Sequence, residues 1–140
     1  MKTSKTWLQS VLALSFLTAL TYTTNANAGA KLKGIWSLHE ITCMSGIAAK
    51  GATEILNLHP TTTFDNEQVT MVVGKYNLTA FYKANDGYLV VTNNSGALIA
   101  SSVYRQKGDT LKIISGADET KSDFCPKNDL EIDTYISTKE

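Results

Sequence analysis

Cys43 and Cys125 are the residues whose chemistry the sequence defines best. In an oxidising compartment, two thiols in one chain usually form a disulfide. Two free buried thiols, or half of a metal site, are the alternatives, and a metal site needs further ligands at close spacing. The only histidines, His39 and His59, stand in neither a C-x-x-C nor an H-x-x-H arrangement. We therefore predict a Cys43–Cys125 disulfide, which closes a loop of about 82 residues and contributes about 4 kcal/mol.

The remaining reactive residues form no catalytic pattern. Serines are plentiful, but no G-x-S-x-G nucleophile elbow occurs. His39 falls in a strand-like run and His59 precedes Pro60, and we interpret both as structural. We therefore do not predict an enzyme, and we expect neither a metal nor a cofactor.

Acidic residues alternate near the end of the chain, at Asp129, Glu131 and Asp133. The period of two places them on one face of a strand over residues 130–137. The other face carries Leu130, Ile132, Thr134 and Ile136, so we expect the acids on the outward side. A solvated edge and an acidic recognition strip both account for them.

The first 28 residues have the pattern of a secretory signal. Lys2 and Lys5 precede a mostly apolar run over residues 7–22, and Ala26-Asn27-Ala28 follows. The run is short and rich in Ser and Thr for a membrane anchor, and no lipoprotein cysteine follows it. We expect residues 1–28 to be a cleaved signal peptide and residues 29–140 to form one domain in the periplasm or outside the cell, without a membrane anchor.

Charge is balanced and scattered. The chain has 13 Lys and Arg against 13 Asp and Glu, and loss of Lys2 and Lys5 with the signal leaves the rest slightly acidic. No basic patch with interleaved aromatic residues occurs, which argues against a nucleic-acid partner. The distribution of charge does not predict the oligomeric state.

Short alternating runs separated by Gly, Asn and Asp predict an all-β domain. In residues 75–83, Tyr76, Leu78, Ala80 and Tyr82 share one face. Asn85-Asp86-Gly87 is a strong hairpin signal. We predict about eight strands, at residues 34–42, 53–58, 67–73, 75–83, 87–93, 97–106, 110–115 and 130–137.

Each cysteine falls in one of the two longer loops, at residues 43–52 and 116–129. The disulfide then joins the end of the first strand to the approach of the last strand. Neighbouring first and last strands favour a closed up-and-down barrel, because closure pairs the edge strands. A sandwich can also bring its ends together, so this alternative remains.

The segment Gly34-Ile35-Trp36, with residues 86–91 and 104–111, resembles the lipocalins and small bacterial lipocalin-like domains of the calycin type. The resemblance implies a small antiparallel barrel of eight strands whose interior holds one small apolar molecule. It also implies that Trp36 plugs the closed end. Arg105 is the candidate for the arginine that packs across this tryptophan in lipocalins, and a solvated strand residue is the alternative.

We therefore expect an exported, lipocalin-like binding protein with a small hydrophobic ligand in its barrel. The expected ligand-binding residues are Trp36, Tyr76, Leu78, Tyr82 and Tyr104. Small residues at positions 100–102 leave room opposite the aromatic rings, unless those rings reach across and fill it. The alternative partner is a protein, bound through the loops by an exported inhibitor or immunity-type protein.

Export predicts a new N-terminus at Gly29. N-terminal sequencing of the exported protein should begin Gly-Ala-Lys, because the small residues Ala26 and Ala28 form the cleavage site. A mature chain that begins at Met1, or protein that stays in the membrane fraction, would contradict the prediction.

Overall fold

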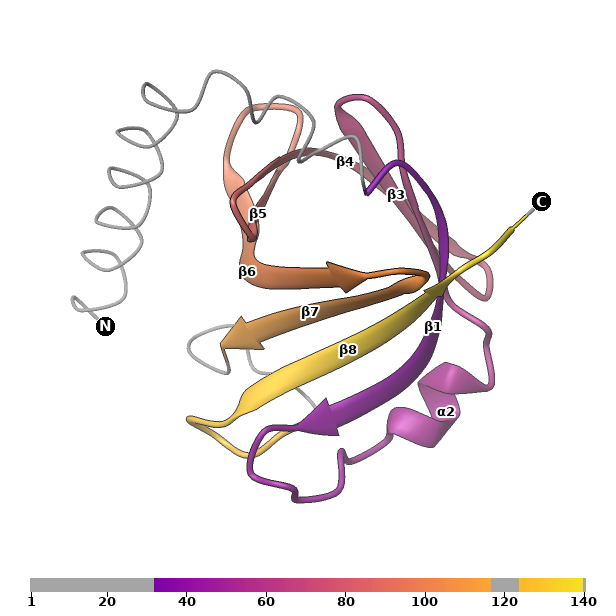
Figure 1. Ribbon diagram of the computed structural model, residues 1–140, viewed down its shortest axis with the longest axis vertical. Coiled ribbons are helices and arrows are strands. Elements are labelled where there is room, and N and C mark those ends of the chain that lie inside the picture. Colours follow the sequence, from indigo (N-terminus) through magenta and orange to yellow (C-terminus); the bar gives the residue numbers. More distant parts are fainter. Residues whose placement is uncertain (1–31, 117–123, 140) are drawn as a thin grey trace.

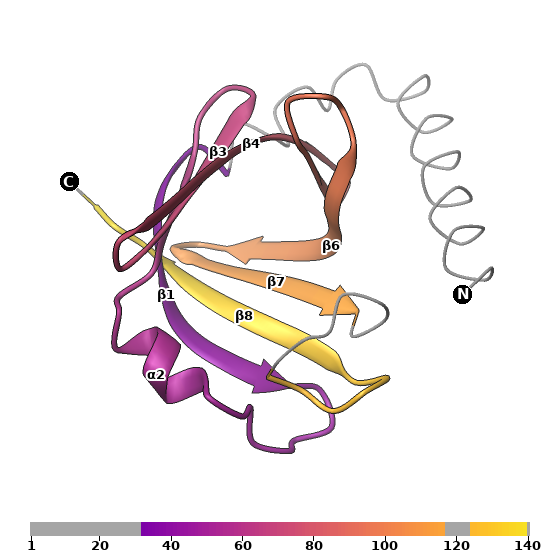
Figure 2. The same ribbon diagram turned by 180° about the vertical axis from the view of Figure 1, so that it is seen from behind.

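A computed structural model describes residues 32–116 and 124–139, which fold into a closed β-barrel. The predicted signal peptide lies outside the described residues. Each strand pairs antiparallel with the next, and β8 pairs with β1, as Figures 1 and 2 show. The elements are β1 (Gly34–Cys43), α2 (Ala52–Leu56), β2 (Thr61–Phe64), β3 (Gln68–Val73), β4 (Tyr76–Asn85), β5 (Tyr88–Thr92), β6 (Leu98–Lys107), β7 (Thr110–Gly116) and β8 (Leu130–Ser137).

The all-β class, the up-and-down order of eight strands and the barrel closure are confirmed. The tight turn between β4 and β5 is also confirmed. Asp86 and Gly87 adopt φ of 47° and 83°, and Asn85 pairs with Tyr88 across the two-residue turn. Positive φ at both central residues matches the right-handed twist of the flanking strands, which explains the Asp-Gly pair.

The strand predicted at residues 53–58 is wrong. Ala52–Leu56 forms the short helix α2, which lies against β1 on the outside of the barrel (Figure 1). Gly51 precedes it with φ of 76°, and the helix contains Ala, Glu and Leu, which are good helix formers. The second strand comes later, at Thr61–Phe64, where three consecutive β-branched threonines favour extended backbone.

Strand β1 is interrupted by a bulge. Its pairing with β8 shifts register between Leu38 and Glu40, and the exposed His39 lies in the bulge. His59 is also exposed, with φ of 50°. Arg105 is exposed on the outer side of β6, while Trp36 points into the barrel, so Arg105 is a solvated strand residue.

The barrel has two ends that differ in packing. We call them the tryptophan end, where Trp36 lies, and the disulfide end, where Cys43 lies. At the tryptophan end Trp36 is 3% exposed, and its indole Nε1 donates to the Leu32 carbonyl over 2.7 Å. Phe64 packs edge-on against Tyr82, with ring centroids 4.9 Å apart. These contacts make the tryptophan end the tightly packed part of the core.

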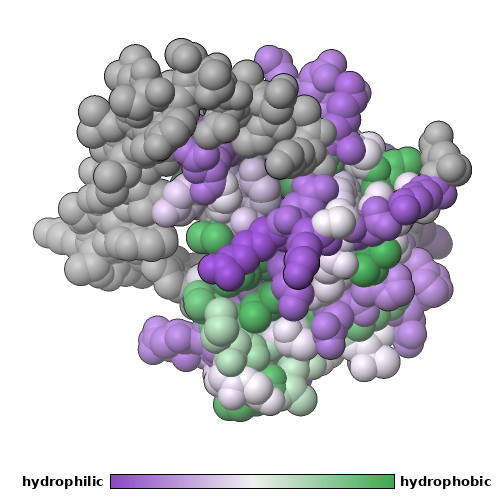
Figure 3. Space-filling model, viewed as in Figure 1, coloured by the Kyte–Doolittle hydropathy of each residue, from purple (hydrophilic) through white to green (hydrophobic). Residues whose placement is uncertain are grey.

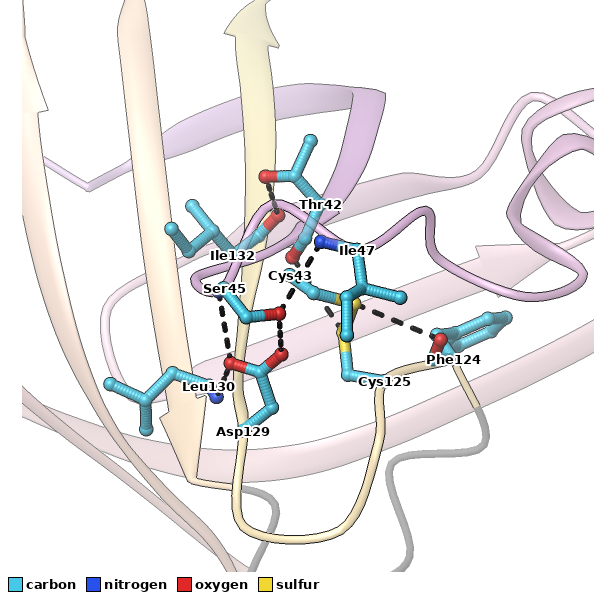
Figure 4. The surroundings of a disulfide bond; sticks show 9 residues. All are labelled: Thr42, Cys43, Ser45, Ile47, Phe124, Cys125, Asp129, Leu130 and Ile132. Carbon is cyan, nitrogen blue, oxygen red and sulfur yellow. Dashed lines mark hydrogen bonds between the residues drawn. A yellow bond between two sulfur atoms is a disulfide. The ribbon is translucent and has the colours of Figure 1, made fainter.

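The predicted disulfide is confirmed at the other end. Cys43 and Cys125 are bonded, with Cα atoms 5.6 Å apart (Figure 4). The backbone N–H of Met44 donates to the Leu130 carbonyl nearby, over 2.8 Å. The bridge therefore fastens the end of β1 to the segment that leads into β8. In the described part of the chain, no helix has the length and apolar character that a membrane crossing requires.

Replacing both cysteines with alanine should lower the free energy of unfolding by about 4 kcal/mol, because the bridge closes a loop with a sequence separation of 82. Urea unfolding followed by circular dichroism measures the difference. Reductant should destabilise the native protein by a similar amount and leave the double variant unchanged. Equal stability of the oxidised protein and the variant would contradict the prediction.

Candidate functional site

A cavity of about 190 Å³ lies inside the barrel, toward the disulfide end. Met71, Leu78 and Ile99 line it and are 41–55% exposed, so the cavity reaches the surface between the β3–β4 and β5–β6 hairpins. The complete lining is Thr62, Phe64, Val69, Met71, Leu78, Ala80, Leu89, Val91, Ile99, Ala100, Ser102, Ile113, Ser115, Asp133 and Tyr135.

Small side chains create this space. Ala80, Ala100, Ser102 and Ser115 stand on the wall at positions where Leu or Ile would fill the interior. The room expected around residues 100–102 is therefore present at Ala100 and Ser102. Ser101 lies between them and is not on the wall, because alternate strand residues point to opposite faces.

Part of the wall is polar. The Ser102 and Ser115 hydroxyls are 2.9 Å apart and hydrogen bond across β6 and β7. Two other wall atoms, Asp133 Oδ1 and Thr62 Oγ1, are buried without a hydrogen-bond partner in residues 32–116 and 124–139. The Thr62 hydroxyl lies near that of Tyr135, but not in hydrogen-bonding geometry. Buried polar atoms normally find partners, so these two atoms are available to a ligand or to water in the cavity.

Asp133 points into the barrel and Glu131 lies on the same face of β8, so the outward placement is wrong for both acids. Asp133 pairs in register with Ile41 of β1 and Ile113 of β7, and it lines the cavity with Tyr135. The outer side of β8 carries apolar and partly buried residues too, such as Ile132. The more apolar face of β8 therefore lies outside, which is the reverse of the usual pattern on which the prediction rested.

Burial raises the pKa of Asp133 to about 7, and the neighbouring Glu131 carboxyl adds to the shift through its charge and a hydrogen bond. The ionised form of Asp133 is disfavoured because two carboxylates in a poorly solvated interior repel each other. Burial also raises the pKa of Tyr135, to which the charge of Asp133 contributes. Asp133 therefore changes charge near neutral pH at the wall of the cavity.

The five predicted ligand-binding residues lie in three places. Leu78 is on the cavity wall. Trp36, Tyr82 and Tyr104 belong to the packed core, where the Tyr82 hydroxyl donates to the Asp65 carbonyl over 2.6 Å. Tyr76 is 81% exposed, near the disulfide end. Of this group, the structure brings only Leu78 to the cavity.

The residues missed by the sequence analysis are chiefly Thr62, Phe64, Ile113 and Asp133. Thr62 and Phe64 belong to β2, which was placed too early in the chain. A run of β-branched residues after Pro60 was the signal that could have located it. In residues 32–116 and 124–139, no three His, Cys, Asp or Glu side chains gather as a metal site.

A second polar cluster holds the loops at the disulfide end together. The Ser45 hydroxyl and backbone N–H both donate to the Asp129 carboxylate (Figure 4). The hydrogen bond from the Ser45 side chain is the main cause that lowers the pKa of Asp129. The backbone N–H of Leu130 donates to the same carboxylate over 2.8 Å. Asp129 thus joins the loop after β1 to the start of β8.

Comparison of the chain with protein-family models, with curated proteins and with solved structures finds no match.

Asp133→Asn should stabilise the protein at pH 8 relative to the native chain, by at most about 4 kcal/mol. The folded-state pKa lies above the ordinary value, so the native protein loses stability as the pH rises from about 4 to about 7. Above pH 7 the full cost of a buried carboxylate remains, and asparagine does not bear it. Thermal unfolding of both proteins at pH 5 and pH 8 measures the effect.

Glu40→Gln is the control for this measurement, because Glu40 is an exposed acid on neighbouring β1. It removes one negative charge without touching the cavity. If Asp133→Asn and the native protein differ in stability by the same amount at pH 5 and at pH 8, the raised pKa of Asp133 is refuted.

Proposed function

We propose that this protein is an exported binding protein, lipocalin-like in type, that holds a small and mainly apolar molecule inside its β-barrel. The cavity that opens at Met71, Leu78 and Ile99 is the observation that carries this proposal. Binding pockets combine apolar walls with a few polar groups, and this wall does so. A disulfide fits the oxidising periplasm or the extracellular space.

The cavity volume limits the ligand. About 190 Å³ is below the roughly 300–1,000 Å³ of pockets for drug-sized molecules. It is close to an engineered apolar cavity of about 150 Å³ that binds benzene. The ligand is therefore of the size of one aromatic ring with a short side chain, or a short alkyl chain, and a longer molecule protrudes through the opening.

The lipocalin-like part of the proposal rests on Gly34-Ile35-Trp36 at the start of β1 and on the position of Trp36. The indole lies in the packed half of the barrel, and the cavity lies toward the opposite end. A barrel of eight strands is just wide enough either to fill with side chains or to enclose one small ligand. Here side chains fill the half of the interior at the tryptophan end, and the cavity occupies the half toward the disulfide end.

A second candidate function is docking to another protein through the loops at the disulfide end. Three apolar side chains, Met44, Ile47 and Leu130, are exposed in these loops. In Figure 3, apolar side chains gather over the loop that follows β1, in the lower part of the face shown. An apolar surface of this kind suits an inhibitor or immunity-type protein.

A saturable rise in melting temperature tests the main proposal. Toluene or 2-phenylethanol should raise it by roughly 5 °C at ten times the dissociation constant, because a ligand that binds only the folded state stabilises it. Ala100→Leu fills the cavity and should abolish the rise. Ser101→Leu adds the same side chain at the next residue, off the cavity wall, and should preserve it.

Two results would refute the binding proposal: no response to either compound, or an equal response in Ala100→Leu and the native protein. Replacement of Met44 and Ile47 by serine should leave ligand binding intact, because neither lines the cavity.

A further inference from the structure

The cavity is chemically two-sided. Strands β3, β4 and β5 contribute only apolar side chains to it, namely Val69, Met71, Leu78, Ala80, Leu89 and Val91. The polar groups come from the other strands, as Thr62, Ser102, Ser115, Asp133 and Tyr135. A ligand that matches this interior has an apolar body and a polar group at one side.

Two buried polar atoms face this space without a hydrogen-bond partner in the described part of the chain. Thr62 is 3% exposed and its Oγ1 is unpartnered, and Asp133 Oδ1 is likewise unpartnered among the described residues. The Ser102 and Ser115 hydroxyls, in contrast, hydrogen bond to each other. A carboxylate only accepts hydrogen bonds when ionised, so Asp133 Oδ1 can accept one from a donor group of the ligand.

The charge around Asp133 is negative. Glu131 and Tyr135 are the titratable groups that face it from its own strand. Its register partners on β1 and β7, Ile41 and Ile113, are uncharged, as is Thr62 on β2. Its pKa is raised, whereas a neighbouring cation would lower it. Among the described residues no cation compensates the charge of Asp133, so a cationic group of a ligand can do so from the cavity side.

We propose that the ligand is a small apolar molecule with a protonated amine, which donates hydrogen bonds to the Asp133 carboxylate while its body lies against β3, β4 and β5. This inference rests on the proposed function, and it names the class of ligand. A fatty acid or another carboxylate is the poorer fit, because its charge would lie beside Asp133 and Glu131. A neutral alcohol satisfies the acceptor without compensating its charge.

Binding of an amine is coupled to loss of a proton from Asp133. The free protein carries Asp133 mostly protonated at pH 5.5 and mostly ionised at pH 8. An alkylammonium group stays protonated over this range. The amine therefore binds more tightly as the pH rises from 5.5 to 8, which is the opposite of the pH effect on the stability of the free protein.

Three compounds with one aromatic ring and different head groups test the inference: 2-phenylethylamine, 2-phenylethanol and 3-phenylpropanoate. NMR titration of the full mature protein gives each dissociation constant. At pH 8, 2-phenylethylamine should bind at least about tenfold more tightly than 2-phenylethanol, because its hydrogen bond joins two charged groups. The carboxylate should bind most weakly.

Asp133→Asn should remove the preference for the amine over 2-phenylethanol at pH 8. Glu40→Gln, which removes an exposed acid outside the barrel, should keep the preference. The pH series on the native protein does not depend on any variant. There the amine should bind about tenfold more weakly at pH 5.5 than at pH 8.

The outcomes separate this inference from the proposed function. If 2-phenylethanol binds and the amine binds no better at pH 8, the amine inference is overturned and the binding function stands. Retention of the amine preference in Asp133→Asn overturns it as well. If no compound binds, both fail.

Discussion

The pairing of β1 with β8 is the constraint on which the rest of the structure depends. It joins the two ends of the sheet, so neither strand leaves an unpaired edge, and it divides every strand into an inner and an outer face. Through this pairing Leu38 lies opposite Tyr135, and Ile41 lies opposite Asp133. The Cys43–Cys125 bond holds the same junction covalently. The position of an acid inside the barrel is thus a consequence of how the barrel closes.

Inside this frame, side-chain size divides the interior. Rings from Trp36, Phe64, Tyr82 and Tyr104 meet at the tryptophan end and fill the width of the barrel. Alanine and serine take wall positions nearer the disulfide end, in the cavity that only Phe64 of these four rings reaches. An unfilled cavity forfeits dispersion contacts and weakens a small domain. The disulfide offsets part of this loss, since it restricts the unfolded chain.

The cavity and the buried carboxyl both lower stability, and they occupy the same place. Burying Asp133 next to Glu131 is unfavourable at neutral pH, and no cation among the described residues lowers the pKa of Asp133. A leucine in place of Asp133 would stabilise the fold, because it would remove the buried carboxyl and fill part of the cavity. Features that cost stability tend to concentrate at functional sites, because binding requires unfilled space and unpaired groups before the ligand arrives. The juxtaposition in this barrel supports the proposal that the cavity binds a ligand.

The sequence by itself determined the features that rest on local chemistry. Strand alternation predicted the all-β class, and Asp86-Gly87 predicted the β4–β5 turn. Two cysteines, together with the expectation of export, predicted the disulfide and the closure. Only the tertiary structure decided where the short helix ends and β2 begins, and which face of β8 lies inside. A period of two shows that a strand has two faces, but in β8 the more apolar face lies outside the barrel. Pairing with β1 and β7 selected the inner one, and with it the residues of the cavity.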